Sequence, residues 1–234
     1  MSASGAVLFA RYAYPPNALG YCGPAGAGAL LRPDATAEIE RRARRFEGAW
    51  TYLRVIAESA GIADPLDPRV VEAYWVGNEL LGKVDPARLV DRLLDRFGGQ
   101  PGGTWRQASG RAVAHHSFQV FEVYPWARLL RAGAGATAVE VLDRCRIRAG
   151  EVVRVDGPSA TVRTRSLRWD GTALVAGPAR ESAARWCVDG MALIDEPRPG
   201  ALVALHFDWV CDELTGDQAT RLGELEAGVR AAMP

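Results

Sequence analysis

The chain has 234 residues, and its formal net charge of +0 comes from 28 basic and 28 acidic residues. This balance argues against a general nucleic-acid binder or a binder of anionic membranes, because both carry a basic excess. The 4 cysteines are dispersed without a C-x-x-C pair, residues 1–11 lack the features of a signal peptide, and no apolar run approaches the roughly 18 residues that cross a bilayer. We therefore expect a cytoplasmic protein that binds neither nucleic acid nor membrane.

The N-terminal part of the chain, residues 1–143, is predicted to be a helical domain with an irregular N-terminal segment. Residues up to Pro33 are rich in proline and glycine, which argues against a regular element there. Apolar residues at helical spacing and helix start signals at Asp34, Asp67-Pro68 and Asp85-Pro86 predict helices over 34–61, 67–82 and 85–97. A loop is expected over 98–103, then a helix over 108–131 that Pro125 bends, with a strand over 117–124 as the alternative. Residues 136–144 are predicted to be a short helix or an extended connector.

The C-terminal part, residues 144–234, is predicted to be a small OB-like β-barrel followed by a helix. Short β-branched or alternating segments are separated by Gly- or Pro-containing turns, a spacing typical of small barrels. The expected strands cover 151–155, 159–169, 172–176, 185–189 and 201–210, and the expected helix covers 216–232. The order of helices and then strands predicts the α+β class.

The last third of the chain also resembles a known family. The resemblance rests on a cysteine, a glycine five residues later, a Val-rich strand, a turn, a Pro-Gly step and a strand that carries a histidine: Cys145, Gly150, Val152-Val153, Asp156-Gly157, Pro199-Gly200 and His206. In this order and spacing the stretch resembles the HypC/HupF hydrogenase assembly chaperones. Two positions differ from that family, since Cys145 is internal rather than N-terminal and Ala149 stands where the family has proline.

The resemblance implies a carrier for the iron fragment of the [NiFe]-hydrogenase active site, Fe(CN)2CO. It assigns Cys145 and His206 as the metal ligands, and a thiolate and an imidazole are both suitable donors to iron. The resemblance also implies the partners, namely the hydrogenase large subunit precursor or another maturation factor. The alternatives are that Cys145 is a small buried apolar residue and that His206 is a hydrogen-bonded structural histidine.

The whole chain is also similar to an uncharacterised bacterial family, mostly actinobacterial, that is associated with hydrogenase gene neighbourhoods. The residues that carry this likeness are Gly20-Tyr-Cys-Gly-Pro24, Ala73-Tyr-Trp-Val-Gly-Asn78, His115-His-Ser-Phe118 and Tyr124-Pro-Trp126.

A second group of candidate residues lies in the helical part. Cys22 with His115 or His116 would be the minimum pair for thiol catalysis, although structural roles for all three are the alternative. Adjacent residues of a helix point about 100° apart, so the two histidines are not expected to share one metal ion. One of them could join Cys22 or a glutamate in a site assembled from separate elements, with the candidates Glu72, Glu79 and Glu122.

Three hypotheses follow, and the first is preferred. In the first hypothesis the protein is an accessory protein for [NiFe]-hydrogenase maturation. This hypothesis requires Cys145 and His206 to lie within a few ångströms of each other. In the second hypothesis it is an enzyme with a Cys/His site in the helical domain, which requires a concave pocket that contains Cys22 and His115 or His116. The third hypothesis is a binding or scaffold protein with a degenerate barrel, which would show exposed apolar surface or a homodimer interface.

Overall fold

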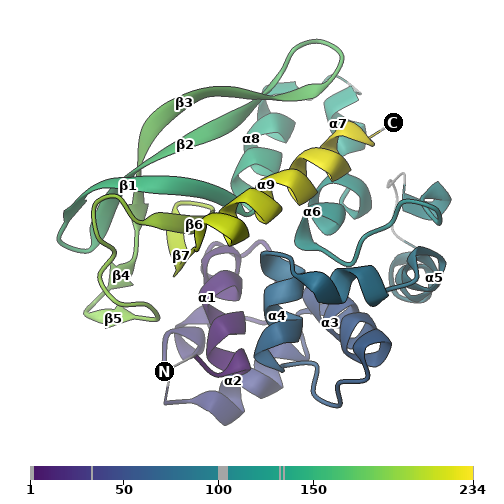
Figure 1. Cartoon of the computed structure of the whole chain (residues 1–234), viewed down its shortest axis with the longest axis horizontal. Helices are drawn as coiled ribbons and strands as arrows, with labels where there is room; N and C mark the ends of the chain where they lie inside the picture. Colours follow the sequence, from purple (N-terminus) through teal and green to yellow (C-terminus); the bar gives the residue numbers. More distant parts are fainter. Residues whose placement is uncertain (1–2, 33, 100–104, 132, 134, 234) are drawn as a thin grey trace.

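The computed structural model describes residues 3–32, 34–99, 105–131, 133 and 135–233 (Figure 1). It belongs to the predicted α+β class. The helical elements before the sheet are α1 (Gly5–Ala18), η1 (Ala27–Leu31), α2 (Thr36–Ala43), α3 (Glu47–Ala60), α4 (Pro68–Trp75), η2 (Glu79–Lys83), α5 (Pro86–Phe97), η3 (Trp105–Gln107), α6 (His116–Phe118), η4 (Gln119–Val123), α7 (Trp126–Arg131) and α8 (Gly135–Cys145). The strands and the last helix are β1 (Arg148–Asp156), β2 (Ser159–Trp169), β3 (Leu174–Arg185), β4 (Cys187–Val188), β5 (Met191–Ala192), β6 (Leu202–His206), β7 (Trp209–Glu213) and α9 (Gly216–Ala231).

The prediction of an irregular segment before Pro33 is wrong, because helix α1 occupies much of this stretch. Ser4 caps the helix by accepting a hydrogen bond from the amide of Val7, and the residues that follow include a buried apolar set. Pro15 and Pro16 lie in the last turn of α1. There they leave two carbonyl groups of the preceding turn without a donor from within the helix but do not prevent the helix from forming.

Of the other predicted helices, the two that begin at Asp-Pro pairs start where the sequence predicts. Asp67 and Asp85 each cap a helix whose first residue is proline, as the Asp-Pro pairs predict. The single helix expected over 34–61 is instead two helices, α2 and α3, which meet at the turn around Phe46. Asp34 is not the cap of α2, because Ala35 holds that position, and the helix predicted over 67–82 ends at Trp75, before Gly77 at φ 98°.

The segment 108–131 is more broken than the predicted helix, and the alternative strand is also wrong. It contains the short helix α6, the π-helical turn η4 and, after Pro125, helix α7. The interruption at Pro125 is as predicted. The loop expected over 98–103 lies mostly outside the described residues, and α8 confirms the helix over 136–144.

The principal sheet has the strand order β1-β2-β3-β7-β6, and β6 also pairs with β1. Between β3 and β7 the described residues form a single pair, Arg185 with Trp209, so this side of the five-stranded sheet is joined at one point rather than by a continuous ladder, and the predicted closed barrel is not complete. Two predicted boundaries are wrong. β3 continues through Gly177-Pro178 because the register shift between Arg165 and Leu167 of β2 accommodates a bulge, and the strand expected over 201–210 is the hairpin β6–β7.

Gly150, one of the positions that carry the family resemblance, is required by close packing within the sheet. A Cβ atom at this position would lie 2.5 Å from Cγ1 of Val162 on the paired strand β2. Any larger residue would therefore push β1 and β2 apart.

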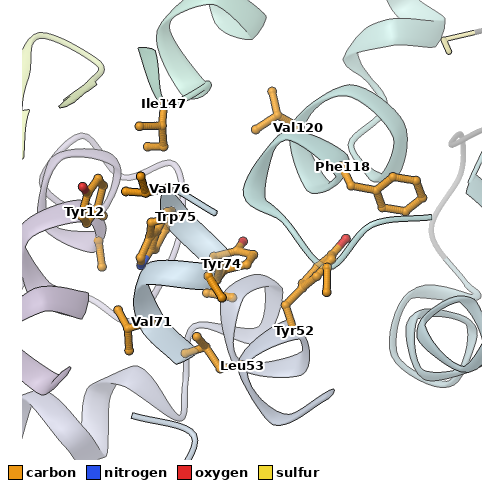
Figure 2. Packing of buried hydrophobic residues seen from close by; sticks show 14 of the residues in the cluster. Tyr12, Tyr52, Leu53, Val71, Tyr74, Trp75, Val76, Phe118, Val120 and Ile147 are labelled. Atoms are coloured by element: carbon orange, nitrogen blue, oxygen red, sulfur yellow. The ribbon is translucent and has the colours of Figure 1, made fainter. Parts of the chain in front are cut away.

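The main hydrophobic core continues from the helical part into the sheet. Figure 2 shows its centre, where Tyr12 of α1, Trp75 of α4 and Ile147 near the start of β1 lie in one cluster. Helix α9 contacts β1, β6 and α6, so it lies between the strands and the helical part (Figure 1). A smaller apolar cluster, which includes Val152 and Val162, is formed by residues of the strands of this sheet.

Candidate metal centre

Three side chains from distant parts of the sequence meet where the helical part contacts the sheet. They are His116, Cys145 and His206, and their potential ligand atoms all lie within 4.8 Å of one another. His116 is the first residue of α6, Cys145 is the last residue of α8, and His206 is the last residue of β6. The structure therefore brings together Cys145 and His206, the two ligands that the family resemblance implies, and adds a third donor.

The C-terminus of α8 explains why these residues meet. The last carbonyl groups of an α-helix have no partner within the helix and must be satisfied from elsewhere. The carbonyl of Arg144 accepts from the amide of Phe207, 2.7 Å away, and the carbonyl of Cys145 accepts from Nε2 of His116 at 2.9 Å. The first bond holds α8 against the end of β6, and the second holds it against α6.

A carbonyl of α1 fixes the orientation of His206. Nδ1 of His206 donates to the carbonyl oxygen of Tyr12 at 2.7 Å, so the proton of the neutral ring is on Nδ1 and Nε2 carries a lone pair. This carbonyl is available because its usual helical donor would be the amide of residue 16, and Pro16 has no N–H. Nε2 of His206 is buried and has no hydrogen-bond partner within the described part of the chain. Such a nitrogen is suited to bind a metal ion, and the bond at Nδ1 is of the kind that orients histidine ligands.

His116 is held differently, because both of its ring nitrogens have partners. Nε2 donates to the carbonyl of Cys145, and Nδ1, at 3.2 Å from the hydroxyl of Tyr74, then accepts from it. His116 can become a metal ligand only by giving up one of these bonds. Its ring also lies 4.7 Å from that of Trp75 and 5.1 Å from that of His206, centroid to centroid. The candidate primary donors for a metal are therefore Cys145 and His206, and His116 is a candidate third donor.

Burial sets the protonation states of all three groups. It lowers the pKa of His116 to about 4 and that of His206 well below its ordinary value, with the neighbouring His116 lowering the latter further. Both rings are therefore neutral at physiological pH. Burial, followed by the nearby Cys22 thiol, raises the pKa of Cys145 far above its ordinary value. Since a metal binds the thiolate, it must displace the thiol proton.

The cluster lies on a cavity of about 1020 Å³. The three cluster residues line it together with Cys22, and Cys145 is partly exposed rather than fully buried. A volume of this size is far larger than a single ion requires, since one water molecule occupies about 30 Å³ of liquid. The cavity therefore has room for further ligands on a metal held at Cys145.

Of the other candidates from the sequence, Cys22 and His116 line the same cavity, as the enzyme hypothesis requires, but the thiol of Cys22 is not activated. Cys22 lines the cavity, but burial raises the pKa of its thiol to about 12, the opposite of an activated nucleophile. His115 caps α6, with Nδ1 accepting from the amide of Ser117, and it is not among the residues that line this cavity. The two adjacent histidines thus do not share a site, as predicted. Among the glutamates, Glu72 accepts a hydrogen bond from Gln218, and Glu122 pairs with Arg111.

Sequence reasoning missed that His116 joins Cys145 and His206, because it assigned these residues to different parts of the molecule. It also missed Gln119, which follows His116 by three residues and lines the same cavity. A spacing of three places two residues on one face of a helical segment, and this was the available signal. The role of Pro16 could not be found without the position of His206.

Comparison with known proteins identifies the family to which the chain belongs. The family of unknown function DUF6390 matches residues 1–230, so the chain belongs to this family. No curated protein and no solved structure matches the chain. Among the described residues, no helix has both the length and the apolar character to cross a membrane.

Proposed function

We propose that this member of the DUF6390 family is an accessory protein for [NiFe]-hydrogenase maturation that holds an iron fragment through Cys145 and His206. The observation that carries the proposal is the pairing of a thiol with an unpartnered, lone-pair nitrogen within 4.8 Å at the wall of a large cavity. The resemblance to the HypC/HupF chaperones points to the same two residues.

The donor set supports a transition metal of this kind. Thiolate and imidazole bind iron, copper, nickel and zinc, whereas calcium and magnesium prefer oxygen ligands. With two primary donors and one adjustable donor, the protein leaves coordination positions open for other ligands. An open site suits a protein that receives and releases a metal fragment, because a closed structural site with four protein ligands would retain its ion.

The sheet supports the proposed relationship to the OB-like chaperone barrel. Five strands form the ring β1-β2-β3-β7-β6, with Cys145 just before the first strand and His206 at the end of β6. This matches the positions that the resemblance assigns to the cysteine and the histidine. The internal position of Cys145 removes the free amine of the family's N-terminal cysteine, and the nearby His116 offers a nitrogen donor in its place.

The partner in this proposal is the hydrogenase large subunit precursor or another maturation factor. Leu19 and Tyr21, at the end of α1, are 53% and 52% exposed, and Tyr21 also lines the cavity. Exposed apolar residues beside the entrance to a site are suited to dock a partner. In the alternative of a scaffold protein, the same residues would form a homodimer interface.

Infrared spectroscopy of protein purified anaerobically from a host that has its hydrogenase genes tests the proposal. We expect cyanide and carbonyl stretching bands that disappear in Cys145→Ala. The matched control is Cys187→Ala, which removes a partly exposed thiol that is not among the residues lining the cavity. Absence of these bands from well-folded wild-type protein, or their persistence in Cys145→Ala, would contradict the proposal.

A further inference from the structure

The side chain of Gln119 is the most unusual polar group in the cavity wall. It is only 1% exposed, and apart from the nearby hydroxyl of Tyr124 its Nε2 and Oε1 have no hydrogen-bond partner within the described part of the chain. A buried amide with few partners costs stability, so a side chain of this kind usually has a role outside the unliganded fold.

Three observations associate Gln119 with the cavity at the metal centre. It follows His116 by three residues on one helical segment, so the two side chains share a face. It lines the same cavity as Cys145 and lies beside Tyr124, whose hydroxyl is close enough to the thiols of Cys22 and Cys145 to interact with them electrostatically. Gln119 is also the first residue of the π-helical turn η4, and π-helical turns are frequent at functional sites.

The charge of the cavity wall indicates the sign of its ligand. Among the lining residues, arginines outnumber acidic side chains by five to three. Three of these arginines form ion pairs with the acidic residues, whereas Arg44 lies over the ring of Trp50, with its guanidinium carbon 5.4 Å from the ring centroid. The excess positive charge and the donor Nε2 of Gln119 both favour a small anion.

We propose that Gln119 binds a small anionic co-ligand of the metal by donating a hydrogen bond from Nε2. This inference rests on the proposed function and specifies its cargo: the site takes a metal that carries at least one small anion, such as the cyanide of an Fe(CN)2CO fragment, rather than a bare ion. The metal binds Cys145 and His206, and the anion occupies an open coordination position on the cavity side. The tests use azide as a stable small anion.

The experiment loads the full chain with Co²⁺ and then titrates azide. Cobalt bound at Cys145 gives a thiolate-to-metal absorption band, and azide binding to the cobalt shifts the visible bands. We expect azide to bind about tenfold more weakly to Gln119→Met than to wild type, which corresponds to about 1.4 kcal/mol. Cobalt binding itself should be unchanged, because methionine preserves the shape of the side chain but removes the donor.

Tyr52→Phe is the matched control. The hydroxyl of Tyr52 is also buried and without a partner in the described chain, but Tyr52 is not among the residues that line the cavity. Removing it should leave azide affinity at the wild-type value. If Gln119→Met does not fold, Gln119→Glu replaces it, and its added negative charge should weaken azide binding by at least as much.

The outcomes separate this inference from the proposed function. Absence of the thiolate-to-cobalt band in wild type contradicts the metal site itself. A normal band with equal azide affinity in wild type and Gln119→Met overturns only the role of Gln119. Azide binding of equal strength to metal-free protein would show a site for free anions and would also overturn the co-ligand assignment.

Discussion

Raising the pH from 6 to 8 should strengthen the binding of Co²⁺ about 100-fold, because each metal ion displaces one proton. The structure defines the source of that proton. Burial raises the pKa of Cys145 far above this range, so the thiol is protonated throughout. The pKa of His116 is about 4 and that of His206 is well below its ordinary value, so both rings are neutral at pH 6 and neither carries a second proton. One proton gives a tenfold change per pH unit, about 2.7 kcal/mol over two units.

Titration calorimetry in buffers of different ionisation enthalpy measures this proton count directly. We expect one proton released per cobalt at pH 6 and at pH 8. An ordinary histidine of pKa about 6.5 is roughly three-quarters protonated at pH 6, so a site with two such ligands and a thiol would release about 2.5 protons there. Release of that size, or release near zero, would refute the reasoning. Cys145→Ala should lose binding, and Cys187→Ala should retain it.

Three further predictions follow from the same region. Pro16→Ala supplies an amide that competes with His206 for the carbonyl of Tyr12, so metal affinity should fall about tenfold. The control Pro15→Ala, one residue earlier, should change metal affinity little. Equal effects of the two substitutions in calorimetry would disprove the orienting role of Pro16. The three histidines are buried and neutral, with pKa values lowered by burial, so their stabilising contribution is complete above pH 6.5 and is lost as the pH falls. The free energy of unfolding in urea should therefore be about 4 kcal/mol lower at pH 5.5 than at pH 7.5, and an unchanged value would contradict their burial in neutral form. The thiol of Cys22, with a pKa of about 12, should be about one ten-thousandth ionised at pH 8, so rapid alkylation of folded protein at Cys22, detected by mass spectrometry, would revive the thiol-enzyme hypothesis.

The strongest local signals in the sequence predicted their elements correctly. The Asp-Pro pairs mark the starts of α4 and α5, and the turn at Asp156-Gly157 separates β1 from β2. Helix α1 was missed because prolines were interpreted as breakers, although in a last turn they only remove donors. The β6–β7 hairpin was missed because its turn includes Phe207 at φ 53°, a conformation usually associated with glycine or asparagine.

The candidate site was predictable only in part. The order of motifs selected Cys145 and His206 through a family resemblance, and the structure places them together. His116 could not be added from the sequence, because its approach to Cys145 depends on how the end of α8 meets α6. Such long-range contacts are set by tertiary packing rather than by any local pattern.

The positions of the three donors along the chain have a consequence for the lifetime of the protein. A metal held by α6, α8 and β6 closes loops of about 30 and about 60 residues, so it acts as a cross-link that the unfolded chain does not have. The loaded protein should therefore open less often than the unloaded one. Because proteolysis in cells follows the population of opened molecules, a carrier that has delivered its cargo would be degraded first, and the amount of protein would follow the supply of metal fragment.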